Sequence, residues 1–209
     1  MMQTPERTAD RDAAIDAMLP LVPQLGWTMA ALRQALTEGG GDARDAELLF
    51  PLGPADMVET FIDLSDRRMI AAAAERNIAA LRVPERVHAV IALRLARNRP
   101  HREAVRRAAA LMASPCHPGL AARCTARTVD AIWHAAGDRS ADINWYTKRA
   151  SLALVYSATL LFWLRDAGED DSATLAFLGR RLEGVSRRVK QRRRLTGALA
   201  RMLPGRAVA

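Results

Sequence analysis

The sequence predicts an all-α fold, a bundle of about nine to ten helices. Half of its 209 residues are apolar, which is enough for a sizeable core, and alanine and leucine are abundant. β-Branched residues are sparse, and apolar residues tend to recur at spacings of three and four, as on a helix with one buried face. No window shows sustained alternation of period two, so we expect no sheet.

Proline, glycine and capping residues divide the N-terminal third into short helices and one long helix. Pro20 and Pro23 make the end of the first helix irregular, because proline cannot donate a backbone hydrogen bond. Thr28 is a plausible N-cap for the second helix, and Pro54 opens the long one. The expected helices are 11–25, 28–36, 43–49 and 54–81, with a glycine-rich turn at 39–42.

The rest of the chain is divided in the same way. Pro84, Pro100 and Pro115 punctuate it, and Gly137 is expected to end a helix in a left-handed cap. Ser140 or Asp142 can cap the helix that follows. The expected helices are 84–98, 101–113, 118–136, 142–166 and one that opens in the acidic run 169–171 and ends near Val189, with a final short helix at 195–203.

Three short helices followed by a longer bundle form the plan of TetR-type repressors. We therefore expect a helix-turn-helix-like region with the start of the long helix at 1–66, a helical bundle at 67–191, and a basic amphipathic segment at 192–209. The charges argue against DNA binding, because Arg44 is the only base from 37 to 66, against eight acidic residues. Such a surface repels a phosphate backbone, so we expect no nucleic-acid partner.

The surplus positive charge lies at the C-terminus. Residues 180–209 carry a net charge of +9 and the remainder −1. Basic side chains beside an apolar stripe are typical of a helix lying on an anionic membrane surface; a solvated basic tail is the alternative. The expected membrane-binding residues are Arg192, Arg193, Arg194, Leu195, Leu199, Met202 and Leu203.

The N-terminus lacks the features of a secretory signal or of an organelle transit peptide. The longest apolar run has about fifteen residues, short of the roughly twenty that span a bilayer. Two cysteines suit a reducing compartment. We therefore expect a bacterial protein that is cytoplasmic and peripheral on the inner membrane.

A specific pattern extends through the C-terminal half. The run Thr-Val-Asp-Ala-Ile-Trp-His-Ala-Ala-Gly-Asp at 128–138 is followed by Asn-Trp-Tyr-Thr-Lys-Arg at 144–149 and by Thr-Leu-Ala-Phe-Leu at 174–178. With Leu152, Tyr156, Thr159, Asp166 and Arg181, it resembles the ubiquinone-biosynthesis accessory proteins of TetR-like fold. Gly-Trp-Thr at 26–28 and Leu-Phe-Pro at 49–51 fit the same family. The resemblance spans roughly residues 10 to 200; the very arginine-rich end departs from it.

The resemblance implies a non-enzymatic, lipid-binding protein that assists the hydroxylation of demethoxyubiquinone. It implies a hydroxylase of the ubiquinone pathway as partner, and a docking patch for it at Asp138, Trp145, Tyr146 and Arg149. Spacing alone leaves a second reading open, in which Trp145 and Tyr146 pack against the next helix. The competing function is a ligand-responsive transcriptional regulator of the same fold.

Residues 150–164 are apolar nearly all round, so most sides of this helix must be covered. The bundle core, a second copy in a homodimer formed by 142–166 and 170–190, or a bound lipid can supply that cover. A cavity with few polar groups suits an isoprenoid tail, so we expect a bound lipid or isoprenoid and no other cofactor. The expected lipid-binding residues are Leu93, Leu111, Met112, Ile132, Val155, Thr159, Phe162, Trp163 and Leu178.

The chain shows no arrangement typical of catalysis. Asp130, His134 and Asp138 are spaced by four and could face one way, but a helix pair and a capping residue explain them better than a metal site. No Gly-rich phosphate loop follows a strand, and no base is marked for a nucleophile. We therefore expect neither an enzyme nor a metal site.

Overall fold

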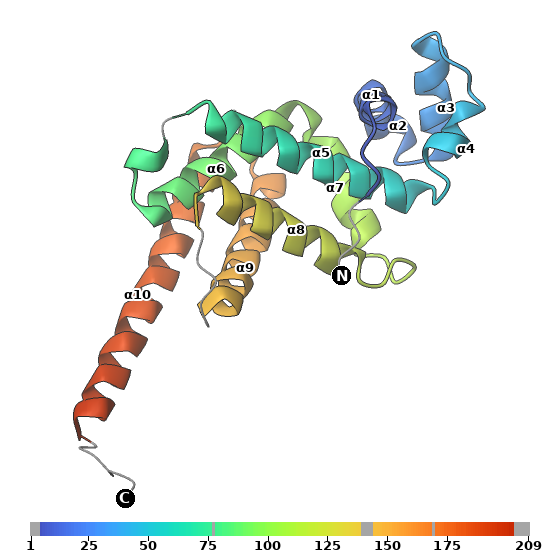
Figure 1. The fold of residues 1–209 in the computed structure, drawn as a ribbon. Coiled ribbons are helices and arrows are strands. Elements are labelled where there is room, and N and C mark those ends of the chain that lie inside the picture. Colours follow the sequence, from blue (N-terminus) through green and yellow to red (C-terminus); the bar gives the residue numbers. More distant parts are fainter. Residues whose placement is uncertain (1–4, 77, 139–143, 169, 203–209) are drawn as a thin grey trace, which may run out of the picture.

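The computed structural model describes residues 5–76, 78–138, 144–168 and 170–202, and the side chains of 144, 145 and 188–202 lie outside that description. Within these ranges the chain forms ten α-helices, two short 3-10 helices and no strand, which confirms the predicted all-α class (Figure 1). The helices are α1 (Ala9–Met18), α2 (Val22–Leu25), α3 (Met29–Glu38), α4 (Asp45–Leu49), α5 (Pro54–Ala74), α6 (Val83–Asn98), α7 (Arg102–Met112), α8 (Leu120–Ala135), α9 (Asn144–Arg165) and α10 (Ser172–Met202), with 3-10 turns at Ile78–Ala80 and Arg99–His101.

The long helix α5 joins the two parts of the fold. Helices α1 to α4 gather at its N-terminal end, and α6 and α8 pack along its length (Figure 1). Helix α9 packs against α8, and α10 against α9 and α6. The C-terminal half of α10 projects beyond the bundle (Figure 1). The predicted division at residues 66 and 191 stays a prediction, since α5 and α10 run through both positions.

Several predicted boundaries are confirmed by their capping geometry. Thr28 Oγ1 accepts a hydrogen bond from the Ala31 backbone N–H at 3.1 Å, which satisfies one of the unpaired donors of the first turn. Pro54 opens α5, and Gly137 has a φ of 75°, the left-handed conformation expected after α8. Ser140 and Asp142, the suggested caps of α9, lie outside the described residues.

Three predicted boundaries are wrong. The helix expected at 11–25 is two helices, because the chain breaks at Pro20 and restarts with Pro23 in the first turn of α2. Helix α5 ends at Ala74 rather than near Leu81, and the half-buried Ile78 then packs against the core. The separate helix expected at 195–203 is the end of α10, since residues 190–195 contain no glycine or proline that would stop the helix.

Arginine–aspartate pairs fasten α1 to α5. The buried Arg11 donates to Asp56, Thr60 and the Leu49 carbonyl. We call the more exposed pairs around it the Arg–Asp ladder: Arg7 with Asp63, Arg67 with Asp12 and Asp63, and Arg68 with Asp16. These contacts hold the helix-turn-helix-like region against the start of the bundle.

Candidate functional site

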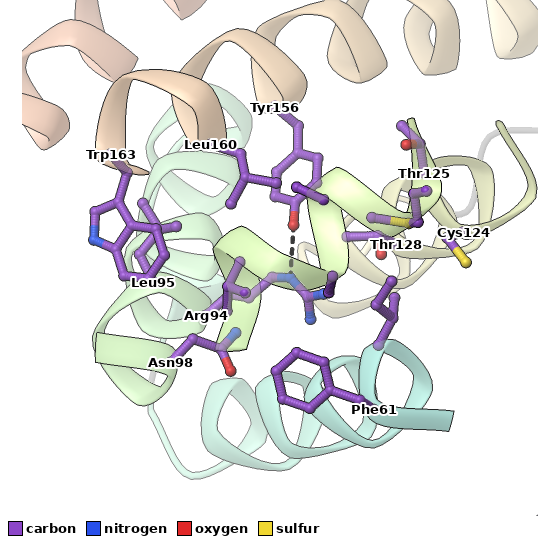
Figure 2. A pocket seen from close by; sticks show the side chains of 15 residues that line it. Phe61, Arg94, Leu95, Asn98, Cys124, Thr125, Thr128, Tyr156, Leu160 and Trp163 are labelled. Atoms are coloured by element: carbon purple, nitrogen blue, oxygen red, sulfur yellow. Dashed lines mark hydrogen bonds between the residues drawn. The ribbon is translucent and has the colours of Figure 1, made fainter. Parts of the chain in front are cut away.

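A small apolar cavity lies inside the bundle, between α5, α6, α7, α8 and α9. Its volume is about 50 Å³. Figure 2 shows Trp163 and Leu160 of α9 on one side of it and Phe61 of α5 on the opposite side. The lining residues are Phe61, Ile62, Arg94, Leu95, Asn98, Val105, Ala108, Ala109, Met112, Cys124, Thr125, Thr128, Tyr156, Leu160 and Trp163.

A buried polar network forms one wall of this cavity. Arg94 Nε donates to Tyr156 Oη at 2.9 Å (Figure 2), and Arg94 Nη1 lies 2.6 Å from Asp66 Oδ1. Thr128 Oγ1 donates to the second Asp66 oxygen at 3.0 Å. All four side chains are buried, so the network brings a paired charge and a phenol to the edge of an otherwise apolar space.

The charges of this network depend on one another. Burial acts to lower the pKa of Arg94, but the neighbouring Asp66 carboxylate and the Tyr156 hydroxyl together outweigh it and raise that pKa above its ordinary value. Burial raises the pKa of Asp66 to about 6, although Arg94 and Thr128 oppose the rise. At pH 7 both groups are therefore ionised, and the positive charge inside the bundle has its counter-charge beside it.

The Tyr156 hydroxyl is available to a ligand. It accepts the Arg94 hydrogen bond, and its own proton has no acceptor among the described residues. A buried phenol ordinarily finds a partner for its proton. Because Tyr156 lines the cavity, a water molecule or a ligand oxygen placed there would accept that proton.

The predicted lipid-binding residues are buried or half-buried, but only Met112 and Trp163 line the cavity. On α9 the lining side chains are Tyr156, Leu160 and Trp163. Val155 and Thr159, one residue earlier, face about 100° away. The remaining predicted residues, Leu93, Leu111, Ile132, Phe162 and Leu178, do not line this cavity either.

Phe162 shows what the neighbouring face of α9 contacts. Its ring stacks on Phe177 of α10, with ring centroids 4.6 Å apart. Thr159 Oγ1 donates to the Val155 carbonyl within α9. Val155, Thr159 and Phe162 thus do not line this cavity, and their assignment to lipid binding stays a prediction.

The cavity is too small for an isoprenoid tail as it stands. Pockets that bury a drug-sized ligand measure roughly 300–1,000 Å³, against about 50 Å³ here. A lipid can enter only if helices around the cavity separate. Lipid binding by the predicted residues stays a prediction, and the separation is a condition for it.

Arginines of α7 fix the end of α9 that carries Trp163. Arg102 donates to the Asp166 carbonyl at 2.6 Å and Arg106 donates to the Leu164 carbonyl, so two carbonyls at the helix end are satisfied. Trp163 Nε1 donates to Asp171 Oδ1 at 2.9 Å. The Arg102 guanidinium also lies over the Trp163 ring, 4.6 Å from its centroid. Trp163 is thus held in place from α7 and from the start of α10.

The predicted docking patch is only partly exposed. Tyr146 is 77% exposed, whereas Arg149 forms an ion pair with Asp130 and Lys148 lies 3.5 Å from Asp138. The side chain of Trp145 lies outside the described residues. These ion pairs join the start of α9 to α8 and to the turn that follows it. The role of the patch in docking stays a prediction.

The helix-turn-helix-like region exposes acidic and apolar side chains. On α4, Leu48 is 79% exposed, and Asp45 and Glu47 also face solvent. The nearby bases are already paired, Arg33 with Glu47 and Arg44 with Asp42. This surface offers little positive charge for phosphate contacts.

Two further sequence features bear on chemistry. Burial raises the pKa of the Cys124 thiol to about 11, so this cysteine at the cavity wall is protonated at neutral pH and is a poor nucleophile. No group of three or more His, Cys, Asp or Glu side chains within the described ranges is placed to hold a metal. None of the helices in these ranges has the length and apolar character to cross a membrane.

Comparison with known proteins gives consistent matches. A model of the COQ9 family matches residues 119–188. The chain is 30% identical over 184 residues to the ubiquinone biosynthesis protein coq9, mitochondrial, of Schizosaccharomyces pombe, covering 87% of this chain and 72% of that protein. It is 28% identical over 204 residues to human COQ9, covering 93% of this chain and 64% of the human protein. It therefore spans only part of the length of these relatives.

The fold has a solved counterpart. The crystal structure of a TetR transcriptional regulator from Nitrosomonas europaea matches with a TM-score of 0.69 and 23% sequence identity, over 86% of this chain and 99% of that one. At this identity the match concerns the fold alone, and it confirms the predicted TetR-like architecture.

The relatives contradict the predicted location. The Schizosaccharomyces pombe, human and Drosophila melanogaster proteins are all named as mitochondrial, so the prediction of a bacterial protein, cytoplasmic and peripheral on the inner membrane, is wrong. It rested on the N-terminal sequence, the length of the longest apolar run and the two cysteines, none of which identifies a compartment. The family model over 119–188 and the match across most of the Schizosaccharomyces pombe protein place this chain in the COQ9 family.

Proposed function

We propose that this chain is a non-enzymatic accessory protein of ubiquinone biosynthesis that holds an isoprenoid quinone intermediate and presents it to a hydroxylase. Membership of the COQ9 family carries the pathway assignment. The cavity supports the ligand class, because its walls are mostly apolar and its polar network offers one phenol proton. An apolar molecule that carries a ring oxygen matches both the apolar walls and the phenol proton.

We propose that the ligand enters between α7 and α8. The cavity is lined by the C-terminal end of α7, with Ala109 and Met112, and by the N-terminal half of α8, with Thr125. These three side chains are only half-buried, and the connection at 113–119 that joins the two helices is largely exposed. Separation of these helix ends would enlarge the cavity without disturbing Trp163, which α7 and α10 residues hold at the other end.

Replacement of Tyr156 by Phe tests the role of the phenol. We expect Tyr156→Phe to weaken the binding of a short-tailed ubiquinone about tenfold, or about 1.4 kcal/mol, because the ring oxygen loses its donor. Quenching of tryptophan fluorescence can follow binding, since Trp163 lines the cavity, and Trp163→Phe identifies its share of the signal.

The control ligand is a hydrocarbon with the same chain length as the short-tailed ubiquinone but without the quinone head. Its affinity should be equal for the wild-type protein and Tyr156→Phe. Equal loss for both ligands would mean that the variant alters packing rather than recognition. Failure of the wild-type protein to bind either ligand would refute the proposed function itself.

The outer face of α9 supports two further interactions. Leu154 is 75% exposed and Leu161 is 57% exposed, and we propose that a second copy of the chain covers them in a homodimer. Sedimentation of Leu154→Glu as a monomer would support this, and an unchanged oligomeric state would refute it.

We propose that the hydroxylase partner contacts Tyr146, at the start of α9, together with Asp138, Trp145 and Arg149 as predicted from the sequence.

We propose that the basic end of α10, from residue 192, contacts anionic lipid together with Leu203, which follows the described helix. The seven residues expected from the sequence have an apolar stripe and an arginine run, and their side chains lie outside the described part of the structure. Liposome flotation that persists after deletion of 192–209 would refute this.

The competing function, a ligand-responsive regulator, is disfavoured because the exposed surface of α4 is acidic and apolar.

A further inference from the structure

A second cavity lies behind the first. It occupies about 190 Å³ between the end of α1, the middle of α5 and the end of α6. Phe61 and Asn98 line both cavities and so stand between them. The other walls of the second cavity are Leu19, Ser65, Arg68, Arg97 and His101, and we call it the polar cleft.

The polar cleft is rich in unused hydrogen-bond donors. Ser65 Oγ donates to Asn98 Oδ1 at 3.3 Å, which occupies the acceptor of that amide and leaves its N–H groups without a partner among the described residues. Arg97 forms no ion pair or hydrogen bond with any described residue, and it is exposed. Arg68 uses both of its Nη atoms on Asp16, and its Nε has no acceptor in the described part of the chain.

The net charge of the polar cleft is positive. Asp16 pairs with Arg68 and acts on His101, and the two hydrogen bonds from Arg68, at 2.8 and 2.5 Å, compensate its charge. The charge of Arg97 has no such compensation among the described residues. Burial lowers the pKa of His101, Asp16 acts to raise it and Arg68 lowers it further. The imidazole is thus neutral at pH 7 and still offers one N–H donor.

We infer that the polar cleft binds a small oxyanion, a phosphate or a phosphate monoester. Arg97, Asn98 and His101, which all carry N–H donors, line a space of about 190 Å³. A water molecule takes roughly 30 Å³ of liquid volume, so the space suits a phosphate group with a short substituent and excludes a nucleotide. Oxyanions need several donors and a nearby positive charge, and the walls supply both.

Calorimetry with the full chain tests this inference. Inorganic phosphate and pyrophosphate are titrated into wild-type protein and into Arg97→Gln, which removes an exposed side chain that forms no hydrogen bond or ion pair with a described residue and should leave the fold intact. Arg180→Gln is the control, because Arg180 is also exposed, lies on α10 and changes the net charge equally. We expect Arg97→Gln to bind at least tenfold more weakly and Arg180→Gln to bind within twofold of wild type.

The His101 resonance gives a local readout. A bound anion stabilises the imidazolium form, so phosphate should raise the pKa of His101 in wild type and in Arg180→Gln, but not in Arg97→Gln. Monomeric dihexanoyl phosphatidic acid against glycerol phosphate distinguishes a lipid head group from a free metabolite, and saturable binding of either supports the cleft. Equal affinities in all three proteins, or no saturable binding to wild type, would overturn the inference.

Discussion

Two aspartates of α5, Asp63 and Asp66, lie about one turn apart on the same helix and pair with different neighbours. Both are buried and both are paired with arginine, but Asp63 faces α1 and Asp66 faces the bundle interior. Burial acts to raise the pKa of Asp63, yet hydrogen bonds from Arg7 and Arg67 outweigh it and lower that pKa. For Asp66, burial prevails over Arg94 and Thr128 and raises the pKa to about 6.

The difference shows how much the surroundings of an ion pair decide its effect. In the Arg–Asp ladder, guanidiniums that still reach water can form several charge-assisted hydrogen bonds at little desolvation cost. In the interior, the single guanidinium of Arg94 must offset the loss of water by two charges. The Arg–Asp ladder therefore fixes α1 on α5 through several weak contacts. The bundle interior instead has one buried ion pair, Arg94–Asp66, and loss of either partner leaves the other charge uncompensated.

Removal of Arg94 should have the largest effect on stability. Arg94→Met leaves Asp66 without its counter-charge and Tyr156 without its donor, and we expect a loss of about 3–5 kcal/mol in the free energy of unfolding at pH 7. Urea denaturation measures it. Arg68→Met is the matched control from the ladder, where 41% of the arginine side chain is exposed, and it should cost at most about 1 kcal/mol. Equal costs would contradict the comparison.

The pH dependence of stability should separate the two aspartates. The folded protein retains the Asp66 proton up to about pH 6, whereas an unperturbed carboxyl releases it near 3.8, so the stability that Asp66 contributes is complete below about pH 4 and is lost as the pH rises to 6. Asp63, with its lowered pKa, contributes stability that is present above pH 4 and is lost as the pH falls.

Unfolding curves of Asp66→Asn and Asp63→Asn at several pH values test these opposite signs. Asp66→Asn should remove the decline between pH 4 and 6, and Asp63→Asn should remove part of the decline below pH 4. A wild-type protein whose stability rises between pH 4 and 6 to the same degree as Asp66→Asn would contradict the assignment to Asp66.

The smallest effect is expected at the outer end of the ladder. Asp16→Asn removes an ion pair in which both side chains are about two-fifths exposed, and its cost, below about 1 kcal/mol, should disappear in 1 M salt because exposed charges are screened. The cost of Arg94→Met should persist in the same salt. A salt-independent cost of Asp16→Asn would mean that this pair acts as a buried one.

Much of the fold was predictable because its signals are local. Thr28, Pro54 and Gly137 mark boundaries through their own backbone chemistry, and each is found where expected. The sequence pattern suggests a helix end near Val189 and a new helix at 195–203. Helix α10 instead runs without a break, because residues 190–195 contain neither glycine nor proline. Helix continuity there follows from the absence of a stop signal rather than from a positive one.

The polar wall of the cavity was missed because its partners are distant in sequence. Arg94 and Asp66 are 28 residues apart, and Arg94 and Tyr156 are 62 apart. One signal was present: Arg94 lies on the apolar stripe of α6 with Val87, Val90 and Ile91, all of which are buried. A charged residue at such a position requires a buried partner. The sequence does not show which residues of α9 face the cavity, because this helix is apolar nearly all round. The pattern favours Val155, whereas Tyr156 lines the cavity.

The most direct test of the central claim is a search for the bound lipid. Ala109→Phe would fill the cavity, which Ala109 lines, and Ala110→Phe places the same ring on the exposed neighbour. The proteins are purified from a host that makes ubiquinone, extracted with organic solvent and analysed by mass spectrometry. We predict an isoprenoid quinone from the wild-type protein and from Ala110→Phe, and a strongly reduced amount from Ala109→Phe. No isoprenoid in any extract, or equal amounts in all three, would contradict the account.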